Sequence, residues 1–365
     1  MHQKRVNCLI EQAKEHNLDV LALVSGPNLF YFTDLSFHLS ERPVLVLFPI
    51  DDAPAIIVPT FEAVKVEDSS IEMNVFSYTD EEGYTAAFQE ACDRLRLAKR
   101  TIGAEAFRMR MVEVKLLEQY APGCNILPAE EALAQLRMHK DQFELEQMRR
   151  AIDITEKALR DTMSQVEVGW TEREVAALLK TKMFQRGGEG MAFSPIVVAG
   201  PNAALPHATP GDRPIQPGET IVVDCGAILG GYAADITRTF AFGELGPDMA
   251  HIYEVVRAAN AAGRAQAGPR TPAEEVDRAA RKVIEEAGYG EYFKHRTGHG
   301  LGLDVHEPPY IVEGNERILK PGMTFTVEPG IYLPGQGGVR IEDDVLVTED
   351  GAESLTMFPR EFAGL

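Results

Sequence analysis

Cysteine is scarce in this sequence, and no two cysteines lie close together. Only four occur in 365 residues, none of them in a C-x-x-C arrangement: Cys8, Cys92, Cys124 and Cys225. Disulfide scaffolds and structural zinc sites need clustered cysteines, so this spacing argues against both. Free thiols are typical of a reducing compartment, and we therefore expect a cytoplasmic protein.

Long apolar runs are also missing. No stretch approaches the roughly 18 apolar residues from which a membrane-spanning helix is inferred. Near the start, Val6, Leu9, Ile10 and Ala13 recur at helical spacing, which predicts an amphipathic helix and not a signal peptide. We expect no membrane partner.

Basic residues are outnumbered by acidic ones. Lys and Arg number 36 against 56 Asp and Glu, which gives a formal net charge of -20. Nucleic acids and anionic membranes are polyanions and would be repelled, so we expect neither as a partner. The charge suits small or neutral substrates, although it also serves solubility alone.

Hydrophobic patterning divides the chain into two domains. Four short apolar segments and one amphipathic segment alternate in the first part, which predicts an α/β domain with a parallel or mixed sheet. The predicted strands span 18–24, 43–50, 54–59 and 101–105, and the helix spans 84–97. A long, charged, helical stretch follows around 127–160, and we place the boundary inside it, giving domains 1–135 and 136–365. Further helices are predicted over 171–188, 247–263 and 272–287, the first capped by Thr171 and stopped by Gly187.

The second domain contains an internal repeat. Residues 212–226 (DRPIQPGETIVVDCG) align without gaps with residues 316–330 (ERILKPGMTFTVEPG) at an offset of 104. Asp224 falls on Glu328, so each copy places an acid at the same point. Unless the match is due to chance, it predicts a pseudo-symmetric domain.

Each copy continues into a second strand that carries another acid. A two-residue loop at Leu229-Gly230 would set Asp224 directly opposite Asp235. A turn near Gly335 would set Glu328 opposite Glu342 in the same way. Paired like charges repel, so either these acids lie at a solvent-exposed sheet edge or they serve a purpose.

Four converging carboxylates in a core need compensating cations, and two divalent metal ions balance four negative charges. Carboxylate oxygens are hard ligands that bridge such ions. His299, between Gly298 and Gly300, is a candidate nitrogen donor. His306 and His207 are further candidates, against the alternative that each is an ordinary core or loop histidine.

The motifs together resemble the prolidases and aminopeptidases P. They are DCGA, ADITRT, GHGLGLDVHE, VEPGIY and VRIEDD, and the resemblance covers nearly all of 136–365. It implies a creatinase/prolidase-like α/β N-terminal domain followed by an α+β "pita-bread" catalytic domain with a pseudo-twofold repeat.

The resemblance also implies roles for individual residues. Five match the metal ligands of the family, namely Asp224, Asp235, His299, Glu328 and Glu342, with Asp235 and Glu342 as the bridging pair. Glu328 also matches the general acid/base, and His207 and His306 match the substrate-side histidines. Arg340 resembles an arginine near the metals, and Thr237, on the same strand face as Asp235, is expected to orient that acid.

The implied activity is that of an Xaa-Pro dipeptidase, which cleaves the bond between an N-terminal residue and a following trans-proline with a metal-activated hydroxide. The oxygen-rich ligand set favours two manganese ions, with cobalt and zinc as alternatives. Relatives are commonly homodimers. Alternative functions are an Xaa-Pro aminopeptidase acting on longer peptides, a creatinase-like hydrolase, and a binding protein without metal ligands.

One position departs from the expected pattern. Many prolidases carry arginine four residues after the histidine matched by His306, where it pairs with the substrate carboxylate, but Tyr310 stands here. Either longer peptides are accepted or another cation binds that carboxylate. Arg42, held by Asp34, is our candidate, and a solvated loop arginine is the alternative.

Overall fold

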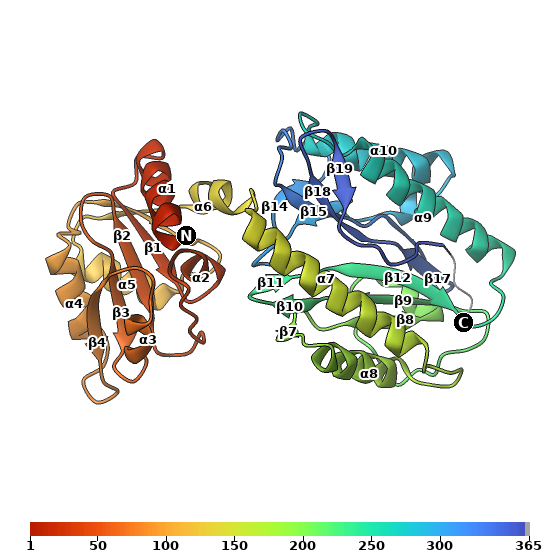
Figure 1. The fold of residues 1–365 in the computed structure, drawn as a ribbon, viewed down its shortest axis with the longest axis horizontal. Coiled ribbons are helices and arrows are strands. Elements are labelled where there is room, and N and C mark those ends of the chain that lie inside the picture. The colour runs from red at the N-terminus through yellow and green to blue at the C-terminus, as the bar shows by residue number, and fades with distance from the viewer. Residues whose placement is uncertain (362–365) are drawn as a thin grey trace. The chain divides into compact units, whose positions relative to one another are not determined.

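The computed structural model describes residues 1–361, which belong to two compact units, Met1–Arg137 and Met138–Leu365 (Figure 1). The division falls two residues after the boundary expected from the sequence. None of the helices in the described residues is both long and apolar enough to cross a membrane.

The N-terminal unit is built on a six-stranded mixed sheet with the order β4-β3-β2-β1-β5-β6. Its strands are β1 (Val20–Val24), β2 (Leu45–Pro49), β3 (Ala55–Pro59), β4 (Asn74–Tyr78), β5 (Thr101–Ala104) and β6 (Asn125–Pro128). The first three are buried along their whole length, which explains why they appear in the sequence as unbroken apolar runs. All four predicted strands are confirmed. The edge strands β4 and β6 were not predicted, because both are partly exposed and lack that pattern.

Six helices accompany this sheet: α1 (His2–Glu15), α2 (Pro27–Thr33), α3 (Val64–Glu67), α4 (Thr85–Arg94), α5 (Met111–Tyr120) and α6 (Glu130–Arg137). In α1, Val6, Leu9 and Ala13 are buried, as their helical spacing predicted. Phe88 of α4 and Leu117 of α5 pack against β1 and β2 in one apolar core. The helices thus complete the predicted α/β domain.

The second unit repeats one arrangement of two helices followed by three strands. The first copy contains α7 (Gln142–Met163), α8 (Glu172–Gln185), β8 (Ile196–Ala199), β9 (Thr220–Cys225) and β12 (Ile236–Ala241). The second contains α9 (Pro247–Gln266), α10 (Ala273–Glu286), β13 (Gly298–Gly300), β15 (Thr324–Val327) and β18 (Asp343–Val347). In each copy the repeated segment forms the central strand, in the orders β12-β9-β8 and β14-β13-β15-β18-β19. The predicted pseudo-symmetric catalytic fold is therefore confirmed.

Short elements complete this unit: β7 (Gly190–Met191), η1 (Gly200–Ala204), β10 (Ala227–Leu229), β11 (Tyr232–Ala233), η2 (Gly290–Tyr292), β14 (Glu307–Ile311), β16 (Gly330–Leu333), β17 (Gly337–Arg340) and β19 (Ala352–Ser354). Helices α7 and α8 pack on β9 and β12, and α9 packs on β16 and β17 (Figure 1). The Thr171 hydroxyl caps α8 by accepting from the Glu174 amide, and Gly187 has a positive φ of 95° just beyond its end. Both signals were predicted.

The first hairpin corrects one prediction. Its two-residue loop is Gly230-Gly231, since Leu229 pairs with Tyr232. Both glycines have positive φ, as a tight hairpin loop of this kind requires, so the glycine pair was the signal that placed the loop. Asp224 consequently faces Thr237, and Asp235 lies diagonal to it. The strand pairing thus differs from the predicted pairing by two residues. Because side chains alternate between faces with a period of two, both acids remain on the same face.

The second hairpin confirms the other prediction. Val327 pairs with Asp343 on one side of the acids, and Gly330 pairs with Arg340 on the other. Both ladders share the register in which Glu328 faces Glu342. The repeat and its two hairpins thereby bring four acids toward one place.

Candidate metal centre

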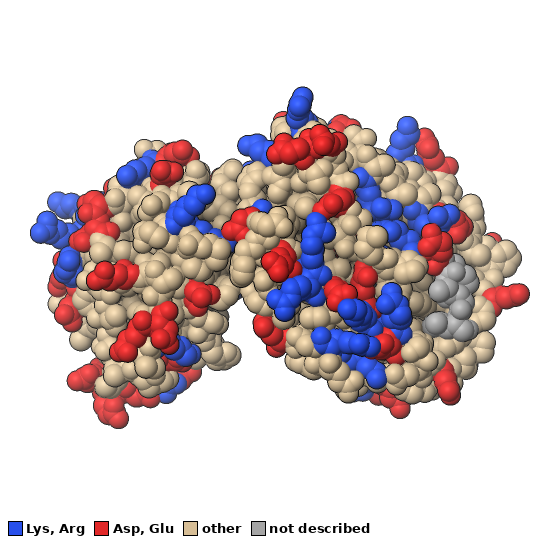
Figure 2. Space-filling view, in the orientation of Figure 1, with Lys and Arg blue, Asp and Glu red and all other residues tan. Residues whose placement is uncertain are grey.

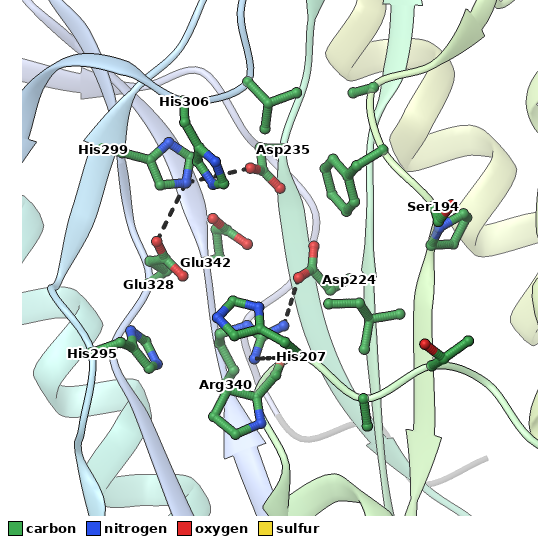
Figure 3. A pocket seen from close by; sticks show the side chains of 18 of the residues that line it. Ser194, His207, Asp224, Asp235, His295, His299, His306, Glu328, Arg340 and Glu342 are labelled. Atoms are coloured by element: carbon green, nitrogen blue, oxygen red, sulfur yellow. Dashed lines mark hydrogen bonds and ion pairs between the residues drawn. The ribbon is translucent and has the colours of Figure 1, made fainter. Parts of the chain in front are cut away.

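A cavity of about 720 Å³ opens among the strands of the second unit (Figure 3). It is lined by all five predicted metal ligands, together with His207, His306 and Arg340. The ligands lie at strand ends or just beyond them, where a chain leaves its ladder and its side chains face the cavity. The exception is His299, which lies in the middle of the three-residue strand β13.

His299 lies within reach of the acids because its neighbours are glycines. A Cβ atom at Gly298 or Gly300 would overlap the backbone carbonyl of Thr326 or of Pro308. The imidazole Nε2 lies 3.4 Å from Glu328 Oε1 and 3.6 Å from Asp235 Oδ2. Asp235, His299 and Glu342 each offer one ligand atom, and these atoms lie within 4.8 Å of one another.

Burial determines the protonation of this cluster. Removal from water, and then repulsion from neighbouring acids, raises the pKa values of Asp235 and Glu342 well above the ordinary range. Burial also raises the pKa of Glu328 to about 8, because the attraction of Arg340 only partly offsets it. The pKa of His299 falls to about 3 through burial and the neighbouring His306, so the imidazole is neutral. Its Nδ1 lies 3.1 Å from the Gly300 carbonyl oxygen, which leaves Nε2 directed at the carboxylates.

The donor set fits divalent cations. Asp224 Oδ2 accepts from Arg340 Nη2 at 2.5 Å, whereas its buried Oδ1 has no hydrogen-bond partner among residues 1–361. A buried carboxylate oxygen without a partner is costly. Carboxylate oxygens beside a neutral imidazole are suitable ligands for divalent ions, whose charge would offset the repulsion among the acids.

Arg340 and Thr237 form hydrogen bonds that fix two of the acids, Asp224 and Glu342. Arg340 is buried and donates from Nε to the Thr237 hydroxyl at 3.1 Å and from Nη1 to the Tyr332 hydroxyl at 2.9 Å. Thr237 Oγ1 donates to Glu342 Oε2 at 2.6 Å. The expectation that Thr237 orients Asp235 was therefore wrong, because its hydroxyl group donates to Glu342 instead.

Asp235 is held by a residue that sequence reasoning missed. Its amide donates to Asp344 Oδ2 at 3.2 Å. Asp344 is the second aspartate of the VRIEDD motif, and burial raises its pKa well above the ordinary range. No signal in the sequence distinguishes its role from that of the adjacent Asp343.

Three histidines besides His299 line the cavity (Figure 3). The His306 ring meets the His299 ring edge-on, with centroids 4.2 Å apart, and its pKa is lowered by burial and by Arg296. His207 lies in the loop before β9. His295 was not among the predicted site residues, yet its Nε2 lies 2.8 Å from the Tyr332 hydroxyl that Arg340 also contacts. Burial lowers its pKa to about 4.

Three residues were considered in connection with the far end of the substrate: Tyr310, Arg42 and Asp34. None of them is among the residues that line this cavity. Tyr310 pairs directly with His299 across β13 and β14, but it does not line the cavity; its ring stacks on the Arg296 guanidinium, 4.5 Å away. Arg42 belongs to the N-terminal unit, where it forms ion pairs with Asp80 and Glu41. Asp34 ends α2 in a left-handed conformation with φ of 62°. The expected contact between Asp34 and Arg42 was wrong, because Asp80 takes the guanidinium in a two-bond pair.

Comparison with known proteins extends over both units. A model described as metallopeptidase family M24 matches residues 146–349, and one described as the creatinase/prolidase N-terminal domain matches residues 5–139. A protein named putative dipeptidase YkvY, from Bacillus subtilis, is 34% identical over 92% of this chain and 92% of its own.

Solved structures resemble the whole chain as well. A dipeptidase from Pyrococcus horikoshii matches with a TM-score of 0.94 and 38% identity, covering 99% of this chain and 100% of that one. A recombinant prolidase from Thermococcus sibiricus matches with a TM-score of 0.95 and 32% identity, over 100% and 99%. An X-Pro aminopeptidase from Thermotoga maritima matches with a TM-score of 0.87 and 31% identity, over 99% of each chain.

Proposed function

Because this chain belongs to metallopeptidase family M24, we propose that it is an Xaa-Pro dipeptidase, which hydrolyses the bond between an N-terminal residue and a following trans-proline. The observation that carries the proposal is the buried cluster of Asp235, His299 and Glu342, flanked by Asp224 and Glu328 in one cavity. Solved dipeptidase and prolidase structures that match nearly the full length of this chain support it.

Two divalent ions would be held by these five residues. The oxygen-rich set favours manganese, with cobalt and zinc as alternatives. When bound, such ions lower the pKa of a water molecule so that hydroxide forms near neutral pH.

The remaining chemistry belongs to side chains of this chain. Proline leaves as a secondary amine and must gain a proton to depart. We assign the role of general acid/base to Glu328, which lines the cavity beside the other proposed ligands. His306 is placed to donate a hydrogen bond to the developing oxyanion, and His207 contacts the substrate from the loop before β9.

An Xaa-Pro aminopeptidase acting on longer peptides is the second candidate, favoured by the resemblance to the Thermotoga enzyme and by the uncharged Tyr310. A creatinase-like hydrolase and a metal-free binding protein are disfavoured, because both lack the ligand set present here. We further propose a cytoplasmic homodimer. The four cysteines are free thiols, which suits a reducing compartment, and sedimentation would measure the oligomeric state.

The test is peptide hydrolysis by metal-stripped protein with and without added manganese. We expect Ala-Pro to be cleaved faster than Ala-Ala and faster than Ala-Pro-Ala, and only with metal present. Preference for Ala-Pro-Ala would favour the aminopeptidase. Cleavage that persists after complete demetallation would contradict the proposed chemistry.

A further inference from the structure

Two arginines line the cavity, and they differ in what they bind. Arg340 is buried, and each of its three nitrogens donates to the protein: Nε to Thr237, Nη1 to Tyr332 and Nη2 to Asp224. Arg296 is partly exposed, and within residues 1–361 it forms no ion pair with an acidic side chain. The cavity thus offers one guanidinium whose charge the described protein leaves uncompensated.

Tyr310 holds this guanidinium in place without neutralising it. The Arg296 carbon Cζ lies 4.5 Å from the centre of the Tyr310 ring. Stacking on an aromatic face leaves the N–H groups at the edge of a guanidinium available, and these match a carboxylate in a two-bond pair. Tyr310 is itself fixed by its pairing with His299 across the strands.

The position of Arg296 suits the far end of a short substrate. Arg296 precedes the proposed ligand His299 by three residues, so their Cα atoms are at most about 10 Å apart. Its charge lowers the pKa values of Glu328, His299 and His306, so it acts on the same part of the cavity as these groups. An extended dipeptide spans about 7 Å, so a dipeptide with its scissile bond at the ligands has its carboxylate within reach of this arginine.

Building on the proposed function, we infer that Arg296, stacked on Tyr310, binds the C-terminal carboxylate of the substrate and thereby selects dipeptides. Arg296 touches no reacting atom, so its contribution is to binding and specificity. A peptide extended beyond proline would carry a neutral amide at this point and would leave the guanidinium unpaired. Discrimination of this kind arises because an unpaired polar group in the site costs free energy.

The test compares Ala-Pro with Ala-Pro amide, which has the same shape without the terminal charge. For the natural protein we expect a kcat/KM for the acid about 10- to 100-fold above that for the amide, the range for hydrogen bonds to a charged group. Arg296→Gln should raise KM for the acid by a similar factor, leave kcat nearly unchanged and leave the amide unaffected. Tyr310→Leu, which removes only the stacking surface, should raise KM for the acid about 2- to 5-fold.

The matched control is Arg278→Gln, an arginine of α10 paired with Glu274, Glu275 and Glu313 on the surface. This variant should leave kcat and KM unchanged for both Ala-Pro and Ala-Pro amide. Loss of activity toward acid and amide alike in Arg296→Gln, or no change toward either, overturns the inference. If Arg42→Ala abolishes the acid preference and Arg296→Gln does not, the carboxylate is bound by Arg42 and the inference is wrong. Failure of the natural protein to cleave any Xaa-Pro peptide with metal present overturns the proposed function as well.

Discussion

The buried acid Asp343 and the cluster of buried acids around Glu342 differ in how far arginine compensates their negative charge. Asp343 is fully buried and forms ion pairs with Arg238, Arg264 and Arg360. Glu342, one residue earlier, is equally buried but faces Asp224 and Glu328. Burial alone raises the pKa of both, yet the arginines bring the pKa of Asp343 below its ordinary value, whereas the pKa of Glu342 stays well above it.

This difference indicates that Asp343 has a structural role, whereas Glu342 requires a bound cation to balance its charge. Where the protein supplies its own counter-charge, as at Asp343, the acid and its arginines stabilise the fold as one unit. Among the described residues, Arg340 is the one arginine that forms an ion pair with the cluster around Glu342, and its partner there is Asp224. The remaining negative charge has to be met from outside the chain, which is the reason to expect metal there.

The largest expected effect is from Asp235→Ala, which removes one of the proposed metal ligands. The protein should then lose most of its bound metal, from about two ions per chain, and its activity should fall below detection. Metal content by atomic emission and hydrolysis of Ala-Pro would measure both. Retention of both ions by this variant would contradict the assignment of Asp235.

Substitution of the adjacent acids Glu342 and Asp343 should change the free energy of unfolding of the metal-free protein in opposite directions. Asp343→Asn leaves Arg238 buried without its counter-charge and should lower the free energy of unfolding by about 3–5 kcal/mol. Glu342→Gln removes the cost of protonating a buried carboxyl group at pH 7, because the unfolded chain has released that proton. The variant keeps an acceptor for Thr237 and should raise the free energy of unfolding at pH 7 by about 1–3 kcal/mol. Urea denaturation would measure both changes. If the two variants shift in the same direction, the two groups of acids do not differ as described.

The last expected effect concerns the pH dependence of stability. In metal-free protein the folded state holds protons on Asp235, Glu328 and Glu342 that the unfolded chain has released, because their pKa values are raised. Stability should therefore fall as pH rises from about 6.5 to 8, by about 1.4 kcal/mol per pH unit for each excess proton. His295 and His299, with pKa values near 4 and 3, are neutral in the folded state throughout this window.

Thermal unfolding at several pH values would measure this slope. Saturating metal should abolish it, because bound ions keep the acids ionised. Metal-free protein that becomes more stable between pH 6.5 and 8 would contradict the raised pKa values.

Much of the fold could be predicted from the sequence, because its main elements carry local signals. Buried strands such as β1 appear as apolar runs, and Thr171 and Gly187 mark the ends of a helix. The edge strands β4 and β6 lack such signals. The loop of the first hairpin was misplaced by one residue, at Leu229-Gly230 instead of the glycine pair Gly230-Gly231, and this shifted the predicted strand pairing by two residues.

The repeat and the motifs determined by themselves which donor types gather in the second domain. Strand side chains alternate between faces, so acids at fixed positions in two copies of a hairpin reach the same face even when a register prediction is off by two. Only the tertiary structure decided which acids are compensated. Arg238 and Arg360 approach Asp343 from distant parts of the chain, Asp80 pairs with Arg42, and Arg296 is left without an acidic partner among the described residues. Charge compensation depends on contacts between separate segments of the chain, and such contacts cannot be predicted from local sequence patterns.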